Sequence, residues 1–319
     1  GLWNFCHEDH PFRNWTWVTV AYCTGDQHMG NHVATYEGNG SSMQVRHIGA
    51  KNADSVLRWV KRTFPNLERI HVVGESAGGW ATFAWTREVA TRWPTAQVAG
   101  WSDSALHLLC PSDICSSALP MVDNTWNATN HFITPSSSAY WTAEALRQPS
   151  WSLADLLVEA LESMGGRMSF GIFTRSADAD QLLYWTLFGG DPSVWTGRMI
   201  SLVNEMEQRL PPALFRSYVV NGSTHGMHRS EELWTMEYRG VKFRDWLGNL
   251  SNCWVPVETM RVWDPLVGSK GTYAGDDETV HTCTTTTTVT WSMSAAATAQ
   301  LCMPLLAASA LTTVGAIFR

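Results

Sequence analysis

The chain carries one serine in a context that is typical of a catalytic nucleophile. Gly74-Glu-Ser76-Ala77-Gly-Gly follows the short apolar run 70–73 and precedes a helix-like stretch of small residues from 77 to 90. This is G-x-S-x-G between a strand and a helix, the sharp turn that lifts a serine above a sheet. The backbone N–H of Ala77, at the helix N-terminus, would then stabilise an oxyanion. Ser76 is therefore the candidate nucleophile.

A serine nucleophile needs a histidine to take its proton and a carboxylate to orient that histidine. In α/β-hydrolases these residues follow the serine in the order acid, then histidine, each after a strand. Asp178 and Asp180 follow one strand-like run, and His225 and His228 follow the next. Either aspartate would also serve as a helix N-cap, and one histidine of the second pair would be an ordinary loop residue. Spacing alone leaves both pairs open.

The elements that must position these residues alternate between strands and helices. Helical spacing occupies 53–64 and 77–90, and the strand-like runs are 15–22, 70–73, 98–101, 169–174 and 216–220. This alternation favours an α/β-hydrolase-like fold, with a mostly parallel sheet and helices on both faces. The chemistry is then expected at the carboxyl ends of the strands. The long stretch 105–163 carries several tryptophans and is expected to form an aromatic-rich cap over the serine.

Composition excludes several classes of protein. With 319 residues and 45% hydrophobic content, the chain is long enough to bury a full core. Arg319 is the only charged residue after Glu278, so residues 1–278 hold 29 acidic and 21 basic side chains, a net charge of −8. An acidic body argues against a nucleic-acid partner. The sequence shows neither a glycine-rich phosphate loop nor a convincing metal motif, so we expect no cofactor and no metal.

The C-terminal part differs from the rest of the chain. We expect a catalytic domain at 1–260, a Thr/Ser-rich linker or stalk at 261–294 and a hydrophobic tail at 295–319. The tail fits a signal for a GPI anchor, a plain membrane anchor or a low-complexity end. Six cysteines without the tail and five Asn-x-Ser/Thr triplets are compatible with disulfides and glycosylation. The chain is therefore expected to be secreted or at the cell surface.

Taken together, the motifs resemble those of the pectin acetylesterase family, which includes the Notum-type carboxylesterases that remove palmitoleate from Wnt proteins. Residues 22–30 are similar to its PYCTGD-x-H-x-G segment, and 47–52 to its H-x-G-x-x-N helix start. Residues 74–79 match its G-x-SAG-G turn, and Asp103-Ser104 its Asp-Ser pair. Residues 178–181 are similar to D-x-x-Q, and residues 222–225 to G-x-x-H.

The resemblance implies an α/β-hydrolase fold with Asp178 as the acid and His225 as the base, which selects them over Asp180 and His228. In the family, a strand and a Gly-Gly-Gly run precede a Cys-Trp-Asn-like segment and supply the second oxyanion donor. This chain opens with Gly1-Leu-Trp-Asn-Phe-Cys6, so the first strand of the domain is expected to be missing.

Several further roles follow as expectations. The oxyanion donors would be Ala77 together with a backbone group of Gly1 or Leu2. Trp3 and Trp126 are the candidate substrate contacts, since aromatic rings stack on sugars or line acyl pockets.

The expected activity is that of a serine carboxylesterase that hydrolyses acetyl esters on an extracellular polysaccharide such as pectin. The alternatives are a Notum-like palmitoleoyl protein deacylase and a catalytically impaired surface binding protein. The expected partners are an acylated polysaccharide or an acylated protein substrate. We further expect a monomer with a possible membrane attachment through the C-terminal tail.

Overall fold

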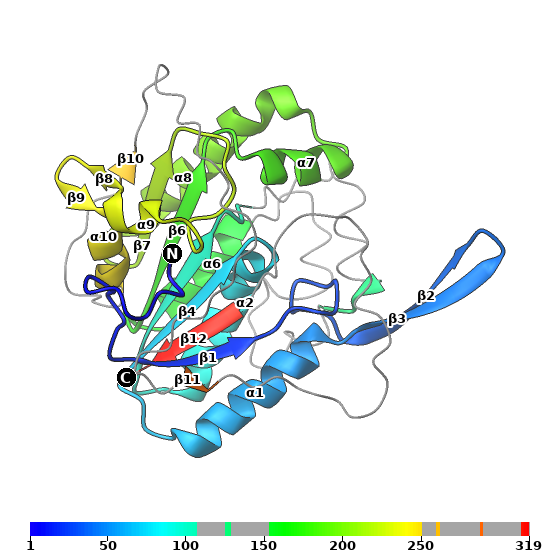
Figure 1. Cartoon of the computed structure of the whole chain (residues 1–319), viewed down its shortest axis with the longest axis horizontal. Coiled ribbons are helices and arrows are strands. Elements are labelled where there is room, and N and C mark those ends of the chain that lie inside the picture. The colour runs from blue at the N-terminus through cyan, green and yellow to red at the C-terminus, as the bar shows by residue number, and fades with distance from the viewer. Residues whose placement is uncertain (107–124, 129–152, 251–259, 262–287, 290–313, 319) are drawn as a thin grey trace.

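A central sheet flanked by helices forms the body of the chain (Figure 1). The computed structural model describes residues 1–106, 125–128, 153–250, 260–261, 288–289 and 314–318. In these ranges the first elements are β1 (Thr16–Val20), β2 (His32–Gly38), β3 (Ser41–His47), α1 (Gly49–Thr63), β4 (Arg69–Glu75), α2 (Ala77–Arg92) and β5 (Gln97–Asp103). The later ones are α6 (Leu153–Ser163), β6 (Met168–Arg175), α7 (Ala179–Leu187), the 3-10 helix η3 (Pro192–Val194), α8 (Trp195–Arg209), β7 (Phe215–Val220), α9 (Glu232–Thr235), β8 (Glu237–Tyr238), β9 (Val241–Lys242), α10 (Phe243–Leu250), β10 (Met260–Arg261), β11 (Thr288–Val289) and β12 (Val314–Phe318).

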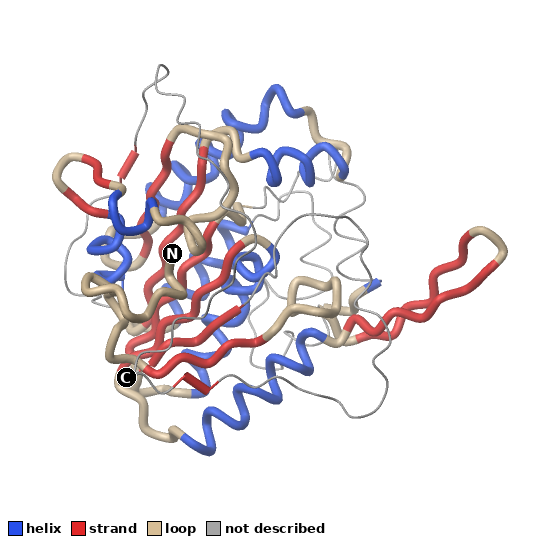
Figure 2. Tube along the Cα trace, viewed as in Figure 1, coloured by secondary structure: helices blue, strands red, loops and turns tan. Residues whose placement is uncertain are grey.

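The central sheet contains eight strands in the order β10-β7-β6-β5-β4-β12-β1-β11 (Figure 2). Its centre is the parallel set β4, β5, β6 and β7, in which each strand pairs with the next along the chain. β12 lies antiparallel between β4 and β1. The predicted α/β fold with a mostly parallel sheet is therefore confirmed.

Two apolar cores cover the two faces of this sheet. Neighbouring strand residues alternate between them: Val72 and Val98 join one core, and Val73 and Ala99 join the other. This alternation follows from the pleat of a strand, which sends successive side chains to opposite faces. Residues of α1, α2, α6 and α8 cover the first face, and the N-terminal segment with α9 and α10 covers the second. Helices on both faces were predicted from the alternating pattern, and the structure has them.

Two parts of the chain differ from the expected outline. A separate hairpin, β2–β3, extends away from the body (Figure 1), and the sequence analysis assigned no element to these residues. β12 comes from the segment predicted to be a hydrophobic tail, and its backbone pairs with β1 and β4. Most of the predicted cap, all of its tryptophans except Trp126, and most of the predicted linker lie outside the described residues.

The described residues also bear on the membrane and disulfide expectations. None of the helices in the described ranges is long and apolar enough to cross a membrane. Cys6 is disulfide-bonded. All of the other cysteines except Cys23 lie outside the described residues.

Candidate active site

Ser76 lies in a strained turn between β4 and α2. Its backbone angles are φ 56° and ψ −121°, a left-handed φ that a non-glycine residue adopts at a cost of order 1–3 kcal/mol. A side chain at Gly74 would overlap the backbone of Gly78, so the turn requires glycine at that position. The N–H of Ser76 donates to the Asp103 carbonyl at 2.9 Å, which fastens the turn to β5. The structure therefore has the strand–turn–helix arrangement that the G-x-S-x-G pattern predicts.

Asp178 and His225 form a buried pair past the ends of β6 and β7. His225 Nδ1 lies 2.9 Å from Asp178 Oδ1 and 3.0 Å from Oδ2, and the two side chains are 8% and 0% exposed. Asp178 also caps α7, since its Oδ1 accepts the N–H groups of Asp180 and Gln181 at 3.1 and 3.0 Å. The side-chain amide of Gln181 donates to Oδ2 at 2.9 Å. These bonds fix the carboxylate that faces His225.

Backbone pairing beyond the strand ends brings this acid and this histidine together. The N–H groups of Ser176, Ala177 and Ala179 donate to carbonyls at 220, 222 and 223, with N–O distances of 2.9, 2.9 and 3.0 Å. The loop after β6 therefore continues along the loop after β7. Asp180, the competing aspartate, is further from the imidazole, with Oδ2 4.0 Å from His225 Nδ1, and its side chain is one-third exposed.

The surroundings of His225 change the pKa of its imidazole. Burial alone would lower its pKa, but the hydrogen bond and charge of Asp178, with smaller contributions from Glu75 and Asp180, raise the pKa to about 9. Its Nε2 is buried and has no hydrogen-bond partner among the described residues. A ring that is fixed at Nδ1 and unpartnered at Nε2 has the arrangement of a general base that awaits a proton.

His228, the other candidate histidine, pairs with a different carboxylate. Its Nδ1 donates to Asp103 Oδ2 at 3.0 Å, and its ring stacks on Trp101 with 4.4 Å between the ring centroids. The backbone N–H groups of Met227 and His228 donate to the same Oδ2, each at 2.7 Å. Asp103 at the end of β5 thus fastens the loop that carries both histidines to the centre of the sheet.

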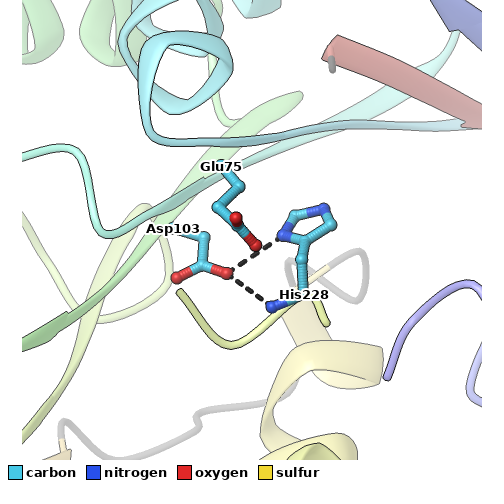
Figure 3. A group of neighbouring side chains, drawn as sticks. All are labelled: Glu75, Asp103 and His228. Carbon is cyan, nitrogen blue, oxygen red and sulfur yellow. Dashed lines mark hydrogen bonds and ion pairs between the residues drawn. The ribbon is translucent and has the colours of Figure 1, made fainter. Parts of the chain in front are cut away.

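Glu75, Asp103 and His228 form a cluster that sequence reasoning missed (Figure 3). One ligand atom from each lies within 4.8 Å of the others, close enough to reach a common cation. Asp103 Oδ2, however, already accepts three hydrogen bonds, and Arg229 Nε lies 3.7 Å from Glu75 Oε1. A cation would have to displace those donors and approach an arginine. We therefore assign the cluster a role in holding the loop.

The predicted oxyanion donors occupy different environments. Ala77 is the first residue of α2, so its N–H has no acceptor within the helix. The N–H of Leu2 donates to the His228 carbonyl at 2.5 Å, and the N-terminal ammonium of Gly1 lies 2.7 Å from Glu231 Oε1. The donors of Gly1 and Leu2 are therefore engaged in this structure. Their role in an oxyanion hole stays a prediction that requires those bonds to break.

The two predicted substrate contacts, Trp3 and Trp126, lie near different candidate residues of the site. The Trp3 ring is 6.4 Å from the His228 ring and 5.9 Å from Trp17. Trp126 is 5% exposed and forms a small apolar group with Ala128, Met29 and Trp80. Trp80 donates its backbone N–H to the Ser76 carbonyl, so this group adjoins the nucleophile turn.

The Thr24-Gly-Asp26 segment forms a hydrogen-bonded unit next to that group, since His47, which it binds, has its ring 6.5 Å from the Trp126 ring. Asp26 is fully buried and accepts the Thr24 hydroxyl at 2.5 Å and the N–H groups of His28 and Gly49 at 3.1 and 2.7 Å. Gly49 begins α1, so the carboxylate lies at the positive end of that helix. His47 Nδ1 donates to the Thr24 carbonyl at 2.8 Å, and His47 Nε2 lies 2.7 Å from the Tyr36 hydroxyl. The motif residues near 22–30 and 47–52 therefore hold each other.

Comparison with known proteins agrees with the resemblance seen in the motifs. The model of the family described as pectinacetylesterase matches residues 2–127. Two crystal forms of the Wnt deacylase Notum from Drosophila are among the similar solved structures. They share 13% and 14% identity with this chain, with TM-scores of 0.49 and 0.47, and each match covers 75% of this chain and 70% of the Notum chain. No curated protein matches.

Proposed function

We propose that this chain, whose residues 2–127 match the model of the pectinacetylesterase family, is a serine carboxylic ester hydrolase that uses Ser76, His225 and Asp178. The observation that carries the proposal is the buried His225–Asp178 pair, with Nε2 unpartnered, on loops at the same edge of the sheet as Ser76. The family match supports an esterase in general. The geometry of the pair supports the assignment of roles.

The proposed reaction has two halves. His225 Nε2 takes the proton of the Ser76 hydroxyl as Oγ attacks the ester carbonyl, and Asp178 stabilises the imidazolium. The Ala77 N–H stabilises the oxyanion of the tetrahedral intermediate, which collapses as His225 protonates the leaving alkoxide. Water then attacks the acyl-enzyme with His225 again as base. The carboxylic acid leaves and the Ser76 hydroxyl is restored.

For the substrate, we propose an acetyl ester on an extracellular polysaccharide. The family description and the apolar group around Trp126 and Trp80 support a small acyl group carried on a sugar. A Notum-like deacylase that removes a longer lipid acyl group from a protein is the alternative. Its support is the resemblance of the motifs to the Notum-type enzymes.

Further proposals concern the compartment, the oligomeric state and the C-terminal tail. We propose that the protein is secreted or held at the cell surface and acts as a monomer. Membrane attachment through the end of the chain would require residues 314–318 to leave the central sheet, where they form β12.

Hydrolysis of p-nitrophenyl acetate by the native protein and by Ser76→Ala tests the activity. We expect Ser76→Ala to lose about 10³-fold or more in kcat, because the nucleophile is gone while the fold remains. Circular dichroism of both proteins checks that the fold is retained. Rates at the uncatalysed background from both proteins would contradict the proposed enzyme activity and favour the surface binding protein.

A chain-length series divides the two substrate proposals. Comparing kcat/KM for p-nitrophenyl acetate, butyrate and octanoate is sufficient. A maximum at acetate supports the polysaccharide esterase, and a maximum at octanoate supports the lipid deacylase.

A further inference from the structure

Glu75 directly precedes the proposed nucleophile in the chain and contacts the residue that follows the proposed base. It is the last residue of β4, directly before Ser76, and its register partner on β5 is Asp103. Its side chain is 8% exposed, and Oε2 is buried with no hydrogen-bond partner among the described residues. A buried carboxylate oxygen without a donor is costly, so its presence here requires an explanation.

The Glu75 carboxyl packs directly against the residue that follows His225. Gly226 has φ +78°, and a Cβ placed there would lie 2.7–3.0 Å from the carboxyl atoms of Glu75. The N–H of Gly226 donates to Ser104 Oγ at 3.0 Å. The peptide after His225 is therefore held between the side chains of Glu75 and Ser104, and only glycine fits.

We propose that Glu75 is a positioning residue: it holds the His225 loop against the nucleophile turn, and its charge sets the pH range in which His225 accepts a proton. The proposal rests on the proposed function, because it assigns His225 as the base. It also explains the cluster in Figure 3, since Asp103 and His228 hold the same loop next to the Glu75 carboxyl.

The charge of Glu75 depends on groups that face it from the neighbouring elements. Those groups are Asp103 on β5 and His225, His228 and Arg229 on the loop after β7. Burial, and then the carboxylate of Asp103, raise the pKa of Glu75, so it ionises at higher pH than an exposed glutamate. Once ionised, it favours the imidazolium form of His225 and raises the pKa of that histidine. Each of the two groups therefore favours the charged form of the other.

The direct test is an NMR titration of the His225 ring nitrogens. It uses the full chain in the Ser76→Ala background, with and without Glu75→Gln, and needs no catalytic activity. We expect Glu75→Gln to lower the His225 pKa by about one pH unit, because a buried neighbouring charge is removed.

Asp180→Asn is the matched control. It also removes one carboxylate near His225, but that side chain is one-third exposed and 4.0 Å from Nδ1. Solvent screens such a charge, so the expected shift is smaller than that of Glu75→Gln. An unchanged His225 pKa in Glu75→Gln, or one lowered no further than in Asp180→Asn, would overturn the proposal.

Kinetic measurements distinguish a failure of the Glu75 proposal from a failure of the proposed function. In active protein, Glu75→Gln should move the ascending limb of the pH profile of kcat/KM for p-nitrophenyl acetate to lower pH by the same amount. If Ser76→Ala is as active as the native protein, the proposed function is wrong. The NMR titration then still tests the proposal on Glu75 independently. If Glu75→Gln is unfolded by circular dichroism, Glu75→Ala replaces it, and the His225 pKa must again fall.

Discussion

At the residue scale, the protonation state of His225 governs the expected activity. The base must be neutral to take the Ser76 proton, and its pKa is raised to about 9. We therefore expect kcat/KM for p-nitrophenyl acetate to rise with pH through an apparent pKa of about 9. A pH–rate profile between pH 6 and 10, corrected for uncatalysed hydrolysis, measures this. A plateau that begins below pH 7 would contradict the assignment of His225.

Asp178→Asn provides a second check of the same prediction. The amide oxygen can still cap α7, but the charge that raises the His225 pKa is lost. The limb should move to lower pH while kcat falls by roughly 10⁴-fold, as happens when a triad carboxylate becomes an amide.

The same shift in pKa has a consequence for stability. Because the folded pKa is raised above the ordinary value of 6.5, protonated His225 stabilises the fold below that value. This contribution is lost as the pH rises through about 9.

The spacing of residues in the sequence limited the candidates for the acid and for the base to two residues each. It could not choose between the members of either pair. It located Ser76 because the strand, the glycines and the helix are all local in the chain. Asp178 and Asp180 stayed equivalent, because hydrogen bonds to residues some forty positions away distinguish them. Glu75 was overlooked since nothing local marks it. Its importance comes from Gly226, about 150 positions later, which packs against it.

At the scale of elements, the 24–28 segment and the start of α1 are joined through one buried carboxylate. Asp26 accepts three donors, one of them the first N–H of α1. Asp26→Ala would leave those donors buried and unpaired, so we expect a loss of about 3 kcal/mol in the free energy of unfolding. Urea denaturation followed by tryptophan fluorescence measures it.

Glu37→Ala, on the exposed hairpin strand β2, is the matched control for Asp26→Ala. It should change the free energy of unfolding by less than about 0.5 kcal/mol. Equal values for the two variants would show that Asp26 does not organise the loop.

The elements that sequence predicts well are the buried parallel strands and the helices between them. Their apolar runs are continuous because both faces of the strand are covered, and β4 to β7 match the predicted runs within a few residues. The hairpin β2–β3 was not predicted from the sequence. Asn39-Gly40 is nevertheless a typical hairpin turn pair, and both residues have positive φ. Exposed strands lack the apolar run that marked the others.

At the scale of the whole molecule, the sheet joins segments from opposite ends of the chain. β1 follows the N-terminal segment, β12 is built from residues 314–318, and the two pair over five residues. β12 pairs equally with β4, the strand that leads into Ser76. A pairing across about 300 residues leaves no local trace, so composition alone favoured a tail for this segment. β4, the strand that leads into Ser76, therefore lies between β12 and β5.

Substitution at Ala316 tests how much the sheet depends on this pairing. Ala316 lies opposite Val18 on β1 and Val72 on β4, so proline there removes a ladder donor from a strand with neighbours on both sides. We expect Ala316→Pro to lower the free energy of unfolding by about 3 kcal/mol or more. Ala316→Gly keeps the N–H and should cost only about 0.5–1 kcal/mol. Because β4 leads directly into Ser76, the proline variant should also lose esterase activity at lower urea concentration than the glycine variant. Identical urea midpoints for the two variants would mean that β12 adds nothing to the stability of the sheet.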